Sequence, residues 1–305
     1  MPSIGFILLT HANEPQILRL ADALNQMFGD PPIACHHDFS QLALNKNHFP
    51  ANVQFVKPHV RTSWGTISLV HAMLKALRLL YDTSAPDWFY LLSGSDYPIR
   101  DAALIRDELA SSPFDAYIRL KKVDHTRVPA RFAEDSCGLD SLRYQRLAYQ
   151  RYIGRSIPIP SPKHPFRGPA AMHFHFLNPR LLQPFHPFNA GFHCYAGDQW
   201  FAANAKVASA LLAPENERLL RYFTGRFPPD EAFCPTVIGN APGLNVSQES
   251  KHYIRWQAGH HPRFLEEQDL RDLLGSKTHF ARKFAPDAPV LDALDTCLGI
   301  AAMQS

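Results

Sequence analysis

The chain has 305 residues, of which 46% are hydrophobic, 19% charged and 11% aromatic. A chain of this length buries a sizeable core, and its composition excludes a disordered, collagen-like or coiled-coil protein. The net charge of +3 is too small to indicate a nucleic-acid partner, and none is expected.

The cysteines are odd in number, and no two have CxxC spacing, which argues against a zinc ribbon or a disulfide framework. They are Cys35, Cys137, Cys194, Cys234 and Cys297. We expect reduced thiols in a cytoplasmic protein. The run Ile4–Leu9 lacks the basic flank of a signal peptide, and no apolar run approaches the roughly 20 residues of a membrane span. We therefore expect at most peripheral contact with the inner face of a membrane.

The chain opens on a pattern typical of alternating strands and helices. Ile4–Thr10 predicts a buried strand, and Asn13 with Gln16 predicts a capping box for the helix that follows. Two more strands are expected at Ile33–Asp38 and Val53–Val56.

The pattern continues with apolar residues at helical spacing from Ile67 to Leu80. Trp88–Ser93 predicts another strand, Ala102–Leu109 a helix and Ala116–Leu120 a further strand. Strands and helices that alternate in this way predict the α/β class, with a mostly parallel sheet and helices on both faces.

The pattern loosens from about Lys121 to Phe188, where Arg, Tyr, His and Pro are frequent. We expect a single domain that spans residues 1–305, with a loop-rich insertion at about 121–188 that lines one side of its cleft. Further helices are expected at Gln199–Leu212, Leu219–Phe223, Asp230–Val237 and Leu265–Leu274.

Polar residues follow three of the predicted strands, where ligands bind in parallel sheets. They are Thr10 and His11, His36 to Asp38, and Ser93 to Asp96. Polar residues that merely end strands are an equally good explanation for each group alone.

Two charged clusters lie further along the chain. Asp230 and Glu231 follow a proline pair, where they either cap a helix or offer a carboxylate that accepts a proton. Lys251, Arg255 and the Arg282–Lys283 pair stand among aromatic residues. These cations form either a solvated basic surface or a grip for a diphosphate.

In chain order these segments resemble the core-2/I-branching N-acetylglucosaminyltransferase and protein xylosyltransferase family (glycosyltransferase family 14), in a bacterial-type form. The resemblance runs from about residue 4 to about residue 287. It rests on the segments 91–100 (LLSGSDYPIR), 197–201 (GDQWF), 229–231 (PDE), 253–256 (YIRW) and 280–284 (FARKF), and on Thr10-His11, His36-His37-Asp38 and Trp64-Gly65.

The resemblance implies a GT-A-like enzyme that inverts the anomeric centre and needs no divalent metal or other cofactor. Glu231 matches the family's catalytic base. Arg255 and Lys283 match the cations that replace the metal at the diphosphate, and the chain has no Asp-x-Asp motif. Lys251 and Arg282 are neighbours that could share this task.

The remaining matches concern donor and acceptor. His36 and Asp38 match the uridine contact, with His37 between them, and Thr10 ends the neighbouring strand. Asp96 either bonds a donor-sugar hydroxyl or caps the following helix. Trp64 lies either near the uridine pocket or in the core, and Trp200 packs either on the acceptor or in the core.

The implied substrates are a UDP-sugar donor, with GlcNAc or xylose favoured, and a glycan or lipid-linked glycan acceptor. The membrane anchor of animal members and the disulfide-bonded loops that shape their choice of acceptor have no counterpart in the pattern. The insertion at about 121–188 is therefore expected to lie on the acceptor side of the domain. One alternative is a non-catalytic protein of the same fold that binds nucleotide sugars or glycans. Another is a metal-dependent enzyme that uses His36-His37-Asp38 or His173-Phe174-His175.

Overall fold

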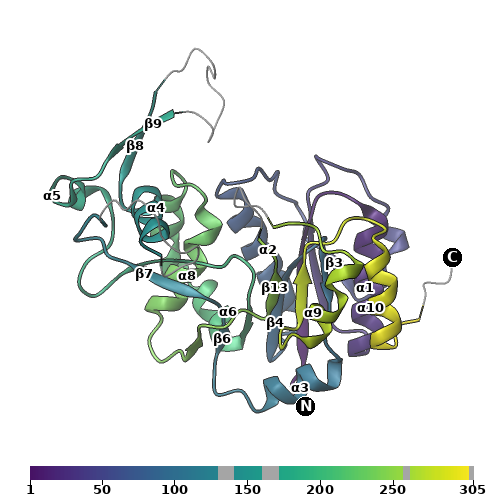
Figure 1. The fold of residues 1–305 in the computed structure, drawn as a ribbon. Coiled ribbons are helices and arrows are strands. Elements are labelled where there is room, and N and C mark those ends of the chain that lie inside the picture. The colour runs from purple at the N-terminus through teal and green to yellow at the C-terminus, as the bar shows by residue number, and fades with distance from the viewer. Residues whose placement is uncertain (130–140, 160–171, 257–261, 302–305) are drawn as a thin grey trace.

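The computed structural model describes residues 1–129, 141–159, 172–256 and 262–301, built around a seven-stranded sheet (Figure 1). Its strand order is β12-β6-β11-β4-β1-β2-β3. The strands are β1 (Ile4–Thr10), β2 (Ile33–His37), β3 (Val53–Phe55), β4 (Trp88–Ser93), β6 (Ala116–Tyr117), β11 (Ala202–Asn204) and β12 (Val246–Ser247). All pairings are parallel except those of β11 with β4 and β6. The predicted α/β class is confirmed.

Strand β1 is buried along its whole length because helices cover both faces of the sheet. Ile7 and Leu9 pack into the core on the side of α2 (Ser68–Thr83). Phe6 and Leu8 pack on the opposite side, with α1 (Glu14–Phe28) and α10 (Pro289–Leu298). A strand buried on both faces requires the continuous apolar run that the sequence has.

The other helices are short. They are α3 (Ala102–Ala110), α4 (Leu142–Tyr152), α5 (Pro179–Leu182), α6 (Ala205–Leu211), α7 (Glu217–Phe223), α8 (Phe233–Asn240) and α9 (Leu270–Gly275). Single 3₁₀ turns are η1 (Lys46–His48), η3 (Gln183–Phe185), η4 (Pro214–Asn216), η5 (Pro229–Glu231) and η6 (Glu267–Asp269). No helix among the described residues is both long enough and apolar enough to cross a membrane.

A three-stranded sheet stands beside the main one, in the order β13-β14-β5. Its strands are β5 (Asp96–Pro98), β13 (His252–Ile254) and β14 (Phe280–Arg282). Strand β14 runs parallel to β13 and antiparallel to β5. The C-terminal third of the chain is thereby joined to the turn that follows β4.

The stretch 121–188 holds more regular structure than the expected loops. Strand β7 (Leu120–Val123) pairs with β10 (Cys194–Gly197), and β8 (Arg155–Ile159) pairs with β9 (Met172–Phe176) in a hairpin. Helix α4 lies between these pairs and buries Tyr149 and Tyr152 in the core on the α2 side. The boundaries of an acceptor-side insertion stay a prediction.

The capping box expected at α1 is wrong. Asn13 has a left-handed backbone and its side chain caps nothing, whereas Gln16 Nε2 donates to the carbonyl oxygen of Phe284 at 3.0 Å. A contact with a distant part of the chain therefore replaces the local one.

Two other predicted boundaries are also wrong. The helix expected over 199–212 begins only at Ala205, because Ala202 and Ala203 pair with β4 and β6 as strand β11. The Asn204 side chain then caps α6 by accepting from the backbone N–H of Lys206. The strand expected over 116–120 is divided between β6 and β7, which belong to different sheets.

The described cysteines carry free thiols. Cys35, Cys194 and Cys234 are buried and Cys297 is exposed. Cys137 lies outside the described residues.

We predict that Leu8→Ala lowers the free energy of unfolding by ~2–5 kcal/mol, because the truncation leaves a cavity in a fully buried strand. Urea denaturation measures this change. Leu104→Ala is the matched control, since Leu104 is 52% exposed, and should change stability by less than about 0.5 kcal/mol. Equal losses in both variants would contradict this account of the core.

Candidate functional site

The carboxyl ends of β1, β2 and β4 meet at one edge of the sheet. Thr10 lies opposite His37, and Leu9 lies opposite Ser93. The structure therefore brings together the three polar strand ends that the sequence singles out. This edge is where open α/β sheets bind ligands.

Asp38 organises two loops at this edge from a fully buried position. Its Oδ1 accepts from the backbone N–H and hydroxyl of Ser40, and its Oδ2 accepts from the backbone N–H of Thr62 at 2.6 Å and from Gln41 Nε2. Burial acts to raise the pKa of Asp38, but these hydrogen bonds outweigh it and hold the pKa far below its usual value. Asp38 thus fixes the loop that contains Thr62.

His36 and His37 are also buried and bonded within the protein. His36 Nε2 accepts from the backbone N–H of Val60 at 2.8 Å, and burial lowers the pKa of His36 to about 4. His37 is hydrogen-bonded through Nδ1 to Thr10 Oγ1 at 2.9 Å and through Nε2 to the carbonyl oxygen of Leu42 at 2.7 Å. Through these hydrogen bonds, His36 and His37 hold the loops at residues 38–42 and 58–63 in place.

Asp96 does not cap the following helix. It is buried, and its two carboxylate oxygens accept from the backbone N–H and hydroxyl of Ser93, each at 2.8 Å. Its Oδ1 also lies 3.4 Å from Arg282 Nε. Asp101 caps α3 instead. The other alternative, a contact of Asp96 with a sugar hydroxyl, stays a prediction; in the structure its oxygens hold the turn and a cation.

Arg255 and Lys283 follow adjacent parallel strands, so both stand at the edge where Arg282 meets Asp96. Arg255 Nη1 lies 2.7 Å from Asp269 and 3.3 Å from Asp272. Lys283 Nζ lies over the ring of Phe264, 4.6 Å from its centroid, and forms no ion pair with a described carboxylate. Lys283 is thus the more available of the two cations.

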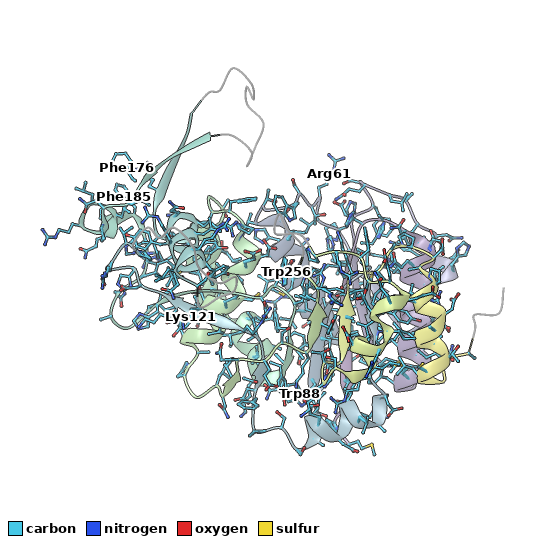
Figure 2. The ribbon with its side chains drawn as sticks, viewed as in Figure 1. Arg61, Trp88, Lys121, Phe176, Phe185 and Trp256 are labelled. Atoms are coloured by element: carbon cyan, nitrogen blue, oxygen red, sulfur yellow. The ribbon has the colours of Figure 1, made fainter. Side chains whose placement is uncertain are left out.

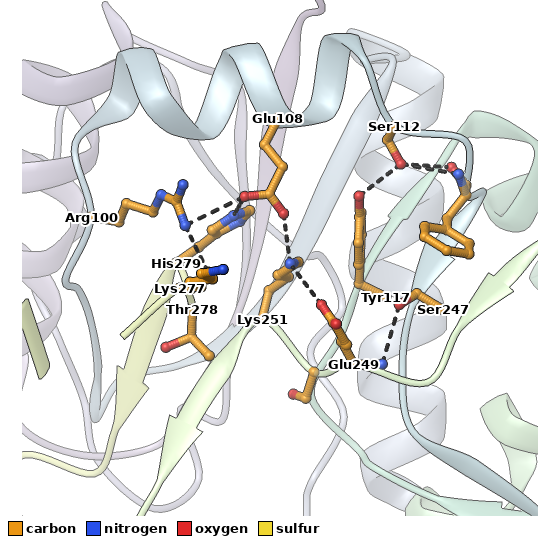
Figure 3. Close-up of polar contacts among 12 residues, drawn as sticks. Arg100, Glu108, Ser112, Tyr117, Ser247, Glu249, Lys251, Lys277, Thr278 and His279 are labelled. Carbon is orange, nitrogen blue, oxygen red and sulfur yellow. Dashed lines mark hydrogen bonds and ion pairs between the residues drawn. The ribbon is translucent and has the colours of Figure 1, made fainter. Parts of the chain in front are cut away.

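Lys251 lies elsewhere. It precedes β13, at the opposite end of that strand from Arg255, and its Nζ forms ion pairs with Glu108 at 2.6 Å and Glu249 at 3.4 Å (Figure 3). Glu108 also contacts His279 Nε2 at 3.2 Å. The expected contribution of Lys251 to a diphosphate site is not supported, because its ammonium lies at the end of β13 away from Arg255, in a partly buried ion-pair network beside α3.

Glu231 ends the 3₁₀ turn η5, whose entry is fixed by Tyr152 Oη donating to the carbonyl oxygen of Pro228 at 2.9 Å. Its side chain is 37% exposed. Burial raises the pKa of Glu231 to about 7, a rise that Arg151 opposes and Asp230 and Asp198 reinforce. A carboxylate with such a pKa is suited to take a proton near neutral pH.

Asp230 is the buried member of the pair. Its Oδ1 has no hydrogen-bond partner in the described part of the chain, and burial raises its pKa to about 6. The charge of Asp230 therefore helps to raise the pKa of Glu231. Of the two carboxylates, Glu231 is the more exposed.

Arg151 is a site residue that the sequence reasoning missed. Its Nη1 lies 3.2 Å from Glu231 Oε2, the two residues being 80 positions apart in the chain. It comes from α4, in the stretch whose pattern gave no clear boundary. Nothing in the local sequence distinguishes Arg151 from the other arginines of that stretch.

The segment 197–200 acts on both groups of charges, since Asp198 influences Glu231 and Trp200 packs against Arg282. The Asp198 carboxylate accepts two hydrogen bonds from the Arg119 guanidinium, each at 2.9 Å. The negative charge of Asp198 also helps to raise the pKa of Glu231. Two residues on, Trp200 lies against the core with the Arg282 guanidinium over its ring, 4.2 Å from the centroid. Trp200 is therefore partly buried, and it contacts both the core and Arg282.

Trp64 is exposed, so its alternative as a core residue is wrong. Its ring packs edge-on against Phe227, which precedes the Pro-Pro-Asp-Glu turn. Gly65 has φ of +72°, and a Cβ there would lie 1.9 Å from the Phe227 ring. This glycine lets the loop after β3 approach the turn that carries Glu231.

The histidine clusters of the metal-dependent alternative have different outcomes. His36, His37 and Asp38 are bonded to protein groups as described above. The side chains of His173 and His175 lie outside the described residues.

Comparisons with known proteins agree with one another. A family model described as Core-2/I-Branching enzyme matches residues 4–134 and 154–274. Xylosyltransferase 2 of Rattus norvegicus is 24% identical over 271 residues, covering 80% of this chain and 27% of that protein. Beta-glucuronosyltransferase GlcAT14B of Arabidopsis thaliana is 25% identical over 248 residues, covering 79% and 50% respectively. The chain thus spans half or less of the length of these relatives.

We predict that Asp38→Asn destabilises the protein by ~1–3 kcal/mol, because an amide nitrogen cannot accept the bonds that the carboxylate accepts. Hydrogen exchange should accelerate in peptides that span residues 58–66. Because folding lowers the pKa of Asp38, this stabilisation is fully present above about pH 4 and is lost as the pH falls below that value. Asp82→Asn, at an exposed position, is the control. Unchanged exchange in residues 58–66 would show that Asp38 does not order this loop.

Proposed function

The chain belongs to the Core-2/I-Branching enzyme family and is a glycosyltransferase, and from this premise we propose an inverting transfer from a UDP-sugar to a carbohydrate hydroxyl without a divalent metal. The setting of Glu231 carries this proposal. Its carboxylate is half-buried, is paired with one arginine and has a pKa of about 7.

Glu231 acts as the base in this proposal. It takes the proton of the acceptor hydroxyl while that oxygen bonds to the anomeric carbon, and the bond from this carbon to the diphosphate oxygen breaks. UDP leaves as an anion, so no second carboxyl has to protonate the leaving group. One base and one cationic site therefore suffice for inversion.

Lys283 is the proposed main ligand of the diphosphate. The absence of an ion pair to a described carboxylate leaves its ammonium available for phosphate oxygens. Arg255 is the second proposed ligand of the diphosphate. Its guanidinium is shared between the diphosphate and the carboxylates of Asp269 and Asp272. Arg282, held by Asp96 and Trp200, supplies positive charge from behind. Cations placed in this way take over the role of a metal.

The uridine is proposed to bind against the loops that follow β2 and β3. Because His36, His37, Asp38 and Thr10 are buried, they hold these loops rather than touch the base directly. The exposed ring of Trp64 offers a flat apolar surface beside the same loop.

Several sugars remain candidates for the donor. GlcNAc and xylose follow from the resemblance, and the relatives named for glucuronosyl transfer add glucuronic acid. A glycan or lipid-linked glycan is the proposed acceptor, and the cytoplasm is the proposed location. A screen of UDP-GlcNAc, UDP-xylose and UDP-glucuronic acid for release of UDP compares the three directly.

We predict that Glu231→Gln lowers turnover by about 10²–10⁴-fold while UDP affinity stays within about twofold, because the amide cannot accept the proton. Lys283→Ala should instead weaken UDP binding by about tenfold or more, because a charged contact is lost. Calorimetry and UDP release measure the two effects.

Lys277→Ala is the matched control, since Lys277 is exposed and precedes β14 at the end away from Lys283. It should change neither quantity. Equal losses of UDP affinity in Glu231→Gln and Lys283→Ala would contradict the division of labour. UDP binding without transfer from any of these donors would favour the non-catalytic alternative.

We further predict that Arg151→Met moves the acidic limb of the pH–rate profile upward by about one unit, because a cation that lowers the pKa of Glu231 is removed. Arg151→Lys should keep the limb near its original position. Arg218→Met changes the net charge equally at an exposed site and serves as the control. An unchanged profile in Arg151→Met would show that Arg151 does not lower the pKa of Glu231.

A further inference from the structure

The charge of the chain is unevenly distributed. Residues 141–197 contain no Asp or Glu, although the chain has 28 of them. The same stretch contains seven basic residues, namely Arg143, Arg146, Arg151, Arg155, Lys163, Arg167 and Arg180. It therefore carries a formal charge of +7, whereas the rest of the chain, with 24 basic and 28 acidic residues, carries −4.

Part of this stretch forms an arm, which we define as residues 153–159 and 172–188. It contains the β8–β9 hairpin, α5 and η3. Figure 1 shows the hairpin projecting from the body of the molecule, on the same side as the loops that follow the carboxyl ends of the central strands. The arm thus extends beyond the edge at which the candidate site lies.

The arm exposes large apolar side chains. Leu181 is 58% exposed, Phe185 is 50% exposed and Phe176 is 42% exposed. Figure 2 shows Phe176 and Phe185 at the outer end of the molecule. Exposed apolar groups that gather on one projecting element mark an interaction surface.

Arginines accompany these apolar groups. The Arg155 guanidinium lies over the Phe185 ring, 4.7 Å from its centroid, and Arg180 is the exposed neighbour of Leu181 in α5. Neither arginine forms an ion pair with a described carboxylate. Apolar side chains interleaved with such cations combine the two forces that hold peripheral proteins on anionic membranes.

We propose that this arm docks the protein onto an anionic lipid surface. Leu181 and Phe185 enter the boundary between headgroups and acyl chains, while Arg155 and Arg180 neutralise lipid phosphates. A soluble polyanion would engage the arginines but would gain nothing from the exposed leucine and phenylalanine. The pairing of apolar and basic groups therefore favours a membrane over a free acidic polymer.

Docking by the arm has a consequence for the proposed transfer. Helix α4, from the same carboxylate-free stretch, supplies Arg151 to Glu231. A membrane held by the arm would therefore adjoin the acceptor side of the site, where a lipid-linked acceptor arrives. This consequence rests on the proposed function, whereas the docking itself does not.

Flotation with vesicles tests the docking without any sugar transfer. The protein should bind vesicles of phosphatidylcholine mixed with phosphatidylglycerol, and phosphatidylcholine alone should bind it about tenfold more weakly. Leu181→Asp with Phe185→Asp should reduce binding to the anionic vesicles by about tenfold or more. Arg155→Gln with Arg180→Gln should weaken binding and reduce its salt dependence.

The matched control is Leu104→Asp with Leu274→Asp, which adds the same charge at residues that are 52% and 41% exposed on α3 and α9. It should bind as the unmodified protein does, and thermal unfolding checks that every variant is folded. Failure of the unmodified protein to bind anionic vesicles would overturn the proposal, as would an equal loss in the control. Binding to heparin but not to these vesicles would also overturn it, by identifying an acidic polymer as the partner.

Discussion

The parallel pairing of β1 with β2 and β4 is the constraint on which the candidate site depends. It places Thr10, His37 and Ser93 at one edge of the sheet, from which three loops leave. Burial on both faces fixes this register, because a shift by one residue would exchange the side chains of the two cores. The smaller sheet joins the same edge where Arg282 meets Asp96, and it thereby adds the C-terminal cations.

The charges at this edge are held by partners from other elements of the fold. Glu231 is paired with Arg151, Arg282 with Asp96, and Arg255 with Asp269. Each pairing fixes the position of a charge and lowers the free energy of keeping it partly buried. Lys283 differs, because within the described residues it has an aromatic neighbour and no carboxylate partner. An anionic ligand would give this cation its counter-charge.

The sequence predicted the alternation of strands and helices well, since β1 and β4 are continuous apolar runs and α2 repeats its apolar positions at helical spacing. It failed at residues 199–204, where small and apolar residues fit a strand or a helix equally well. The resemblance selected Asp96, and the basic cluster around Arg255 added Lys251. The partners of these two residues, Arg282 and Glu108, come from remote parts of the chain. Arg151 was missed for the same reason, because only the fold brings α4 to Glu231.

A titration of UDP into the protein by calorimetry, first with EDTA and then with added manganese, tests the central claim most directly. We predict the same dissociation constant in both conditions, because Lys283 and Arg255 take the place of a metal at the diphosphate. Binding that appears only with manganese would contradict this prediction.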